Sequence, residues 1–394
     1  MNRLEYVLAA AFLRLLGQVF SVLPARPERV VLATARTSVL EGNLLHLHRA
    51  MLASRPDLDY VLLLEPYSYG LLGKLAYIAR LARGLYHLRT AGLFVVDNAY
   101  LPIHVAPHGP RTTVVQVWHA AGALKRFGAD GATPLSEPER TFLHRHYDHV
   151  VTAGEASRVA WAAALRTPLE RVLPLGAPRT DFFFDAAAMS EARARQLAAY
   201  PDLAGRQVAL YAPTFRGRGP HKRGSAALDA ERLRAALPPE WILVLKGHPN
   251  LDPSEMPTKG YDVVIDPAVE INELLALTDV LITDYSSSIF EYALLRRPLI
   301  VLMGDLREYE LDPGLYLDYR TEMIGTQVGD TDGVVAAILA NDFDFSSYDA
   351  FIERHLGACD GGASLRFVEH FLGEGFASDS KQAPRPSWSP GAWR

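Results

Sequence analysis

Two histidines follow apolar runs of the chain, in positions that suit catalysis. His119 comes directly after the run 114–118, and His248 follows the run 241–245 within Lys246-Gly247-His248-Pro249. Such runs predict buried parallel strands, and open α/β sheets keep their sites at the carboxyl ends of such strands. A neutral imidazole accepts a proton near pH 7. A lone histidine is more often structural, but the small residues 120–122 and the basic pair that follow His119 favour a catalytic role.

A second constellation lies in the stretch 279–302, where three serines separate a strand from a helix. Val280–Ile282 predicts the strand, Thr283-Asp284-Tyr285 ends it, and a helical pattern runs from Ile289 to Leu295 after Ser286, Ser287 and Ser288. Backbone N–H groups and the positive end of a helix dipole attract anions, and three hydroxyls add donors suited to a diphosphate. The spacing of Ser288 and Glu291 also predicts a helix capping box, which is compatible with ligand binding.

The elements that position these residues alternate between strands and helices along the chain. Further strands are expected at 29–33, 60–64, 93–97, 149–152, 208–211, 263–266 and 299–302, and helices at 42–55, 71–92, 185–200, 270–275, 331–341 and 350–372. This alternation predicts an α/β fold of two doubly wound, Rossmann-like domains that face a cleft. We place the first domain at 28–203 and the second at 204–372. The basic loop 216–223 is either solvated or a clamp over phosphates.

Both ends of the chain differ from these domains. Residues 1–27 are mostly apolar but Arg14 interrupts them, which favours an amphipathic helix on a membrane or on the domain over a signal peptide or a span. The segment 71–92 holds Lys74, Arg80, Arg83 and Arg89 and no acid, which is typical of a membrane-surface helix or of an ordinary solvated one. Residues 373–394 are rich in Pro, Ser and Gly, and we expect a disordered tail.

Composition excludes several classes of protein. The chain has 394 residues with a net charge of −5, which makes a general nucleic-acid binder improbable. Its single cysteine, Cys359, cannot form an internal disulfide, and this fits a reducing compartment. Histidine and cysteine do not cluster at the spacing of metal ligands, and the Asp-x-Asp triplets at 57–59 and 342–344 lie away from the expected cleft. We therefore expect no metal or other cofactor.

Five motifs together resemble the CDP-glycerol glycerophosphotransferases, the teichoic acid primase and polymerase family. They are QVWHAAGALKRFG (116–128), GAPRTDFFF (176–184), LYAPTFRG (210–217), LKGHP (245–249) and INELLALTDVLITDYSSSIFEYALLRRPLIVL (271–302). The last is long and specific, and the others are weak singly. The family often has His-Gly-Thr-Pro where this chain has His-Ala-Ala-Gly at 119–122, and Arg-Pro-His-Pro where it has Lys-Gly-His-Pro at 246–249.

The resemblance implies a GT-B-like fold and a transfer of glycerol phosphate, or a similar polyol phosphate, from CDP-glycerol to an acceptor hydroxyl, with release of CMP. It implies His119 as the base and His248 as a group that stabilises the diphosphate or the leaving CMP. The substrate-binding residues that it suggests are Thr214, Arg216, Asp284, Ser286, Ser287, Ser288, Glu291, Lys125, Arg126 and Arg179. For Asp284 a structural role is equally compatible, and for Glu291 both ribose binding and helix capping stay open.

The resemblance also implies partners and a location. A lipid-linked polymer acceptor and an anionic membrane surface are expected, with the enzyme attached peripherally to the cytoplasmic face. Two alternatives remain at this point. One is a glycosyltransferase or sugar-nucleotide epimerase of the same fold that uses a UDP-sugar. The other is a non-catalytic, membrane-bound module that binds anionic polymer through 71–92 and 216–223.

Overall fold

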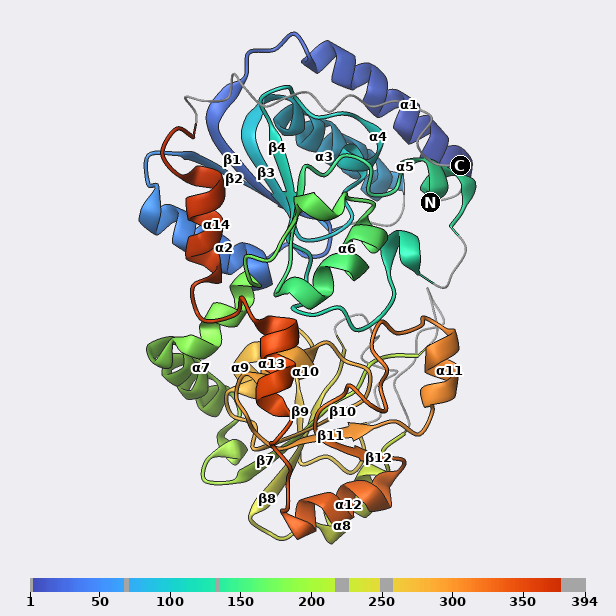
Figure 1. The fold of residues 1–394 in the computed structure, drawn as a ribbon, viewed down its shortest axis with the longest axis vertical. Helices are drawn as coiled ribbons and strands as arrows, with labels where there is room; N and C mark the ends of the chain where they lie inside the picture. Colours follow the sequence, from blue (N-terminus) through green and yellow to red (C-terminus); the bar gives the residue numbers. More distant parts are fainter. Residues whose placement is uncertain (1–2, 67–70, 132–134, 217–226, 249–257, 377–394) are drawn as a thin grey trace.

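Two parallel six-stranded sheets lie one above the other along the long axis of the molecule (Figure 1). The structure is a computed structural model, and it describes residues 3–66, 71–131, 135–216, 227–248 and 258–376. Every strand pair within the two sheets is parallel. The predicted α/β class with two doubly wound sheets is therefore confirmed.

The first sheet has the order β2-β1-β3-β4-β5-β6 and the second the order β12-β11-β10-β7-β8-β9. Their strands are β1 (Arg26–Thr34), β2 (Asp59–Leu64), β3 (Ala91–Val96), β4 (Thr113–Gln116), β5 (His149–Val151), β6 (Val172–Leu173), β7 (Gln207–Ala212), β8 (Trp241–Lys246), β9 (Val263–Ile265), β10 (Val280–Thr283), β11 (Leu299–Leu302) and β12 (Thr326–Val328). Strands β3, β8, β10 and β11 are buried along their whole length. Burial on both faces explains why they appear in the sequence as continuous apolar runs.

Helices pack on both sheets. They are α1 (Arg3–Phe20), α2 (Gly42–Ser54), α3 (Leu71–Thr90), α4 (Leu101–Val105), α5 (Glu137–Phe142), α6 (Arg158–Leu165), α7 (Ala186–Ala199), α8 (Ala230–Ala236), α9 (Ile271–Leu275), α10 (Ser288–Ala293), α11 (Leu306–Leu311), α12 (Thr331–Ala340), α13 (Tyr348–Leu356) and α14 (Ala363–Leu372), with the 3-10 segment η4 at Pro178–Phe184. The single helix predicted at 350–372 is wrong, because α13 and α14 are separated by a glycine-containing turn in which Gly361 has φ +90°.

The chain crosses between the two halves after α13. Helix α13 lies against the second sheet beside α10, whereas α14 returns to the first sheet and packs on α2 (Figure 1). Phe367 and Leu372 of α14 join the buried cluster that contains Leu44 of α2. The C-terminal helix thus packs on the half that the first strands build, although the sequence groups it with the second.

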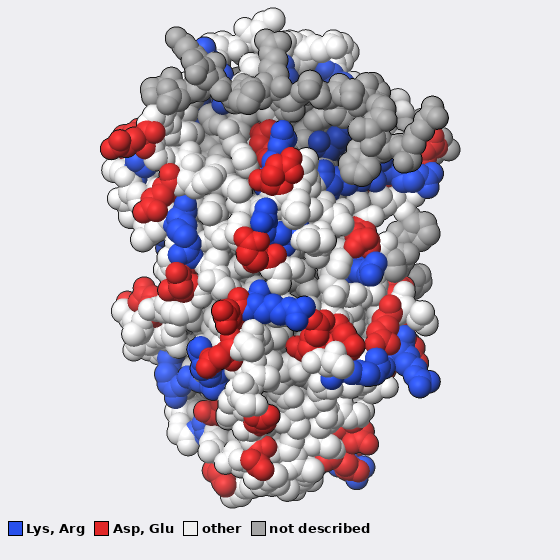
Figure 2. Space-filling view, viewed as in Figure 1, with Lys and Arg blue, Asp and Glu red and all other residues white. Residues whose placement is uncertain are grey.

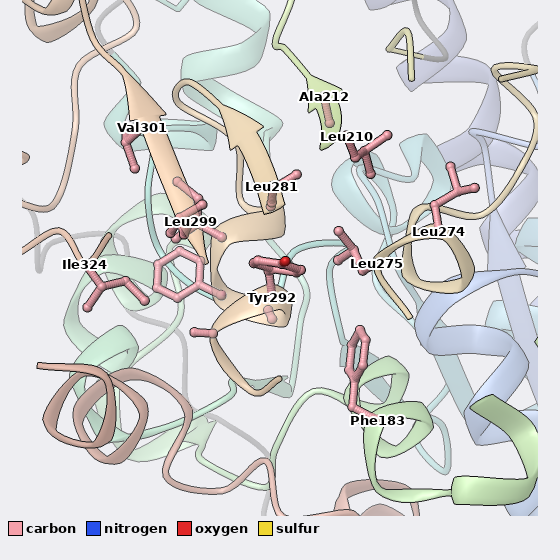
Figure 3. Close-up of a cluster of buried hydrophobic side chains, with 14 of the residues drawn as sticks. Phe183, Leu210, Ala212, Leu274, Leu275, Leu281, Tyr292, Leu299, Val301 and Ile324 are labelled. Carbon is pink, nitrogen blue, oxygen red and sulfur yellow. The ribbon is translucent and has the colours of Figure 1, made fainter. Parts of the chain in front are cut away.

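One hydrophobic core spans both halves of the molecule. Phe182 and Phe183 of η4 share a cluster with Leu275, Leu281 and Tyr292 of the second half, and Figure 3 shows Phe183 pointing toward Leu275 and Tyr292. A Cβ atom on Gly122 would lie 2.5 Å from the ring of Phe290 in α10. The small residues after His119 therefore let α10 approach the first half closely.

Helix α1 is apolar on two opposite faces. Ala10 and Leu13 are buried against the first half, and the Arg14 guanidinium donates from Nε to the Val105 carbonyl oxygen at 2.8 Å. The opposite face exposes large apolar side chains, namely Leu8, Phe12, Leu15, Val19 and, just beyond the helix, Val22. Within the described part of the chain, no helix is long and apolar enough to cross a membrane.

The three arginines of α3, at 80, 83 and 89, have partners within the chain. Arg83 pairs with Glu65, Arg80 donates to the Pro66 carbonyl oxygen at 2.8 Å, and Arg89 donates to the carbonyl oxygens of Pro107 and His108. These arginines organise their own surroundings, so they do not form a row of solvated charges. On the face drawn in Figure 2, basic and acidic side chains are interspersed rather than gathered into one patch of a single sign.

Candidate active site

The turn after β4 carries His119 in a constrained backbone. Trp118 has φ +49°, which is uncommon for a residue other than glycine. The Gln116 side-chain oxygen accepts the Trp118 N–H at 2.8 Å, and the Trp118 and His119 rings stack with centroids 4.6 Å apart. His119 Nδ1 lies 3.1 Å from the Asp97 carbonyl oxygen. A carbonyl can only accept, so the proton sits on Nδ1 and Nε2 is left as the basic nitrogen.

A buried polar network supports this turn from behind. Gln116 Nε2 donates to the Tyr147 hydroxyl at 3.0 Å, and the same hydroxyl lies 3.3 Å from His104 Nε2 and 3.1 Å from His144 Nδ1. Burial lowers the pKa of His144 to about 3 and that of His104 well below its ordinary value. The network is therefore uncharged, and it fixes Gln116, which in turn holds the Trp118–His119 turn.

His119 itself stays neutral over a wide range of pH. Burial is the largest cause that lowers its pKa to about 3, and the charges of Arg36, Arg179 and His248 lower it further, against the raising effect of the bond to Asp97. The effect of His248 on this pKa places the two histidines, which come from different sheets, within electrostatic range of each other. His248 itself lies after β8, where its ring meets Phe215 edge to face at 4.8 Å.

Arg179 forms hydrogen bonds and ion pairs with both halves of the molecule. From η4 its Nη1 donates to the His119 carbonyl oxygen at 3.1 Å and its Nη2 to Glu270 Oε1 at 2.6 Å, while Nε lies 3.5 Å from Glu291 Oε1. Its backbone N–H donates to Asn43 Oδ1 at 2.9 Å. Burial alone would lower the pKa of Arg179, but Glu270 and Glu291 raise it above its ordinary value. The guanidinium therefore stays charged and joins the His119 turn to α9 and α10.

The predicted capping box between Ser288 and Glu291 is wrong. Ser288 is the first residue of α10, the N-cap is Ser287, and no side chain caps the helix. Glu291 is instead only 2% exposed and turns toward Arg179. Burial raises its pKa against the opposing charge of Arg179, and Glu291 Oε2 has no hydrogen-bond partner among the described residues.

The serine turn is compact and partly satisfied within itself. Ser286 Oγ and Ser288 Oγ are 2.8 Å apart, and the Ser288 N–H lies 3.3 Å from Ser286 Oγ. The N–H groups of Ile289 and Phe290 donate to the carbonyl oxygens of Ser286 and Ser287. The backbone N–H groups of Ser288, Ile289 and Phe290 are thus already engaged, and α10 has six residues, so the serine hydroxyls are the more prominent donors at this turn.

Asp284 organises the loops at the end of β10. The buried carboxylate accepts from the Thr214 N–H and hydroxyl at 2.8 and 2.9 Å, and it lies 2.9 Å from Arg216 Nη1. Arg216 also forms a two-pronged contact with Asp305, at 2.7 and 3.2 Å. Burial would lower the pKa of Arg216, but Asp305 and Asp284 raise it. Asp284 contacts no histidine among the described residues, and it fixes Thr214 and Arg216.

Two lysines at the cleft are less basic than usual. Burial lowers the pKa of Lys125 to about 8, against the charge of Asp284, and its Nζ lies 5.3 Å from the centre of the Tyr309 ring. Burial likewise lowers the pKa of Lys246, to about 8, while its Nζ donates to the Pro267 carbonyl oxygen at 2.7 Å. Arg126 is exposed, and its backbone N–H donates to the Gly314 carbonyl oxygen at 3.0 Å.

Sequence reasoning missed several acidic residues of the cleft. Asp97 is buried at the end of β3, 3.8 Å from Arg36, and its Oδ1 has no hydrogen-bond partner within the described chain. Burial raises the pKa of Asp97 and of Glu41, opposed in both by Arg36. Asp97 ends the predicted strand 93–97, so the strand-end argument used for the histidines could have found it, whereas Glu270 opens the predicted helix 270–275 and carries no such signal.

The structure thus brings most of the predicted site residues to one cleft. Arg179 joins the His119 turn to Glu291 in α10, which follows the serine turn, and Lys125 lies within the electrostatic influence of Asp284. Arg218, His221, Lys222 and Arg223 of the predicted clamp lie outside the described residues. In the described ranges, no three His, Cys, Asp or Glu side chains are grouped to hold a metal ion.

Known proteins match both the chain and its fold. A Bacillus spizizenii protein described as a teichoic acid ribitol-phosphate primase is 33% identical over 368 residues, covering 90% of this chain and 94% of its own. A poly(ribitol-phosphate) polymerase of that organism is 31% identical over 94% of this chain and 60% of its own length. The wall teichoic acid polymerase TagF superposes with a TM-score of 0.73 at 19% identity, over 94% of this chain and 95% of that one.

A weaker structural likeness concerns a different activity. A UDP-GlcNAc 2-epimerase from Neisseria meningitidis superposes with a TM-score of 0.54 at 13% identity, over 87% of this chain and 99% of that one. At such low identity these superpositions show a shared fold. The model of the CDP-glycerol:poly(glycerophosphate) glycerophosphotransferase family matches residues 15–373, and the chain therefore belongs to that family.

Proposed function

We propose that this protein transfers a polyol phosphate from a CDP-polyol to a hydroxyl of a teichoic-acid-like or capsular polymer, releasing CMP. Family membership and the similarity to a ribitol-phosphate primase over almost its whole length support this function. The observation that carries it is the link that Arg179 makes between the His119 turn and α10, the helix that follows the serine turn, with His248 within electrostatic range of His119. The similarity to ribitol-phosphate proteins makes CDP-ribitol the first donor to test, with CDP-glycerol second.

The proposed reaction is a single displacement at phosphorus. An acceptor hydroxyl attacks the β-phosphorus of the CDP-polyol, a new P–O bond forms to the acceptor, and the P–O bond to CMP breaks. His119 Nε2 accepts the proton that the hydroxyl loses, since Nδ1 is held by Asp97. A base with a pKa of about 3 is weak, but a bound diphosphate places negative charge beside the ring and raises that pKa toward neutrality.

The remaining roles follow from chemistry and position. His248, with Ser286, Ser287 and Ser288, stabilises the diphosphate, and Lys125 and Arg126 face an anionic acceptor. Thr214 and Arg216 act through Asp284, because the Thr214 hydroxyl donates to that carboxylate and Arg216 is held between it and Asp305. Glu291 Oε2, buried and unpartnered in the described chain, accepts a hydroxyl of the donor's ribose.

His119→Ala tests this mechanism. The variant should release CMP about 10²–10⁴ times more slowly, the usual contribution of a general base, while calorimetry shows the CDP-polyol bound as before. A variant with near-normal turnover would exclude His119 as the base. The same assay in EDTA tests the expectation that no metal is needed, and activity lost in EDTA and restored by Mg²⁺ would contradict it.

A lipid-linked acceptor implies an enzyme that rests on the cytoplasmic face of the membrane. The exposed apolar face of α1 supports attachment there, with Leu15 and Val19 each more than half exposed. The arginines of α3 contribute less than their charge suggests, because they have partners within the chain. Leu15→Glu with Val19→Glu should release the protein from anionic vesicles, whereas Leu339→Glu, at an exposed site on α12, should not. Retention of the α1 variant on vesicles would contradict this attachment.

A further inference from the structure

A second cavity opens at the carboxyl edge of the first sheet, away from the histidines. It has a volume of about 550 Å³, and Ser38, Glu65, Pro66, Arg80 and Arg83 contribute its polar lining. Ser38 follows β1, Glu65 follows β2, and the two arginines come from α3. None of these residues takes part in the site described above.

Glu65 has unused hydrogen-bonding capacity in this cavity. Its side chain is 9% exposed, and one carboxylate oxygen pairs with Arg83. The other, Oε2, is buried and has no hydrogen-bond partner in the part of the chain that the structure describes. A buried carboxylate oxygen without a donor is costly, and native structures seldom leave one so. A hydroxyl group of a ligand in the cavity would supply that donor.

The two arginines add the complementary half of the site. Each guanidinium carries five N–H donors in a planar fork that matches a phosphate. Arg80 lines the cavity and donates to the Pro66 carbonyl oxygen, and the side chain of Arg83 is 55% exposed beside its pair with Glu65. Two guanidinium groups and one carboxylate together fit a phosphodiester that carries hydroxyl groups, because the arginines take the phosphate and Glu65 takes a hydroxyl.

The cavity and the His119 turn both lie at the carboxyl ends of strands in the first sheet. The strand order β2-β1-β3-β4 places Glu65 three strand spacings from the His119 turn, which is about 14 Å along the sheet edge. Arg36 and Asp97, after β1 and β3, line the interval between them. We infer that this cavity binds a polyol phosphate unit of the acceptor chain, behind the hydroxyl that reacts at His119. The inference rests on the proposed transfer of polyol phosphate.

Arg80→Gln and Glu65→Gln test this subsite, with Arg111→Gln as the matched control. Arg111 is an exposed arginine just before β4, so it lies at the amino ends of the strands, whereas the cavity lies at their carboxyl ends. Initial rates of CMP release would be measured with a short, soluble polyol phosphate oligomer as acceptor. Because hydrogen bonds to charged groups contribute strongly, Arg80→Gln should raise the KM for the acceptor about ten- to hundredfold. The KM for the donor should stay within about twofold, and Glu65→Gln should act in the same direction.

Binding measurements separate the sources of the phosphodiester. Calorimetry with glycerophosphoglycerol, and sedimentation with phosphatidylglycerol vesicles, would be run on each variant after melting curves confirm folding. Loss of affinity for the soluble diester, with vesicle binding retained, supports the acceptor subsite. An unchanged acceptor KM overturns it. Loss of vesicle binding alone also overturns it, and assigns the cavity to a lipid headgroup. If the natural protein releases no CMP from any CDP-polyol, the proposed function fails, and diester binding then decides on the cavity by itself.

Discussion

Replacing Arg179 by Met should destabilise the protein through Glu291. Arg179 neutralises Glu270 and Glu291 and holds the His119 carbonyl, and its side chain is only 12% exposed. Without it, the carboxylate of Glu291, 2% exposed, is left in the core with no opposite charge beside it. Removing one member of a buried ion pair costs about 3–5 kcal/mol. We expect a loss of that size in the free energy of unfolding, measured by urea titration at pH 8.

A double-mutant cycle and a surface control isolate the cause. Arg179→Met combined with Glu291→Gln leaves no buried charge, so the two effects should fall short of additivity by about 0.5–3 kcal/mol. Arg195→Met breaks a similar pair, with Glu273 at 2.8 Å, but Arg195 is 55% exposed, and surface pairs contribute about 0–1 kcal/mol. Strict additivity, or a loss for Arg179→Met no larger than for Arg195→Met, would refute the reasoning.

The pH dependence of the Arg179→Met destabilisation independently checks that Glu291 causes it. Burial raises the pKa of Glu291 above its ordinary 4.5, and Arg179 opposes the shift. In Arg179→Met that opposition is gone, so the folded state holds a proton on Glu291 over a wider range of pH than the unfolded state does. The destabilisation should therefore be smallest near pH 4.5 and grow as the pH rises. A destabilisation that shrinks as the pH rises would contradict this assignment.

Three further predictions concern catalysis. Because the pKa of His119 is about 3, kcat/KM should stay flat as the pH falls from 8 to about 5, and kcat should decline at a higher pH than kcat/KM because bound diphosphate raises that pKa; an acid limb of kcat/KM near 6.5 would contradict this. Ser286→Ala with Ser287→Ala should weaken binding of the CDP-polyol more than that of cytidine, measured by calorimetry, and equal losses would mean that the turn had only lost its shape. Gln116→Leu should lower kcat about tenfold or more, with an unchanged KM for the donor and an unchanged fold by circular dichroism, because Gln116 positions the His119 turn; unchanged kcat would remove that role.

The sequence predicted the parallel α/β architecture well because buried strands produce continuous apolar runs. The runs that became β3, β8, β10 and β11 were each identified in this way. The short strands β6 and β12 were missed, since two or three residues carry too little pattern. The predicted helix 350–372 combined α13 and α14 because apolar residues recur on both sides of the turn between them, whose glycines at 357, 361 and 362 mark the break.

The site was predictable to the extent that strand ends determine it. His119, His248 and the serine turn lie after the carboxyl ends of β4, β8 and β10, where the apolar runs of the sequence predicted them. The partners of Arg179 and Glu291 could not be found, because they depend on how η4 of one half meets α10 of the other. The spacing of Ser288 and Glu291 indicated a local cap, but a charge from the distant Arg179 competes for the carboxylate. The basic pattern of α3 similarly concealed the pairing of Arg83 with Glu65.

The most direct test of the proposed function is a donor panel assayed for nucleotide release. Purified protein would be incubated with CDP-ribitol, CDP-glycerol or a UDP-sugar, each with and without a polyol phosphate acceptor. Released nucleotide would be measured by chromatography and the new phosphodiester by phosphorus NMR. The proposed function predicts CMP release from a CDP-polyol that depends on the acceptor and yields one phosphodiester for each CMP. Turnover of the UDP-sugar, with no CMP released from either CDP-polyol, would contradict it.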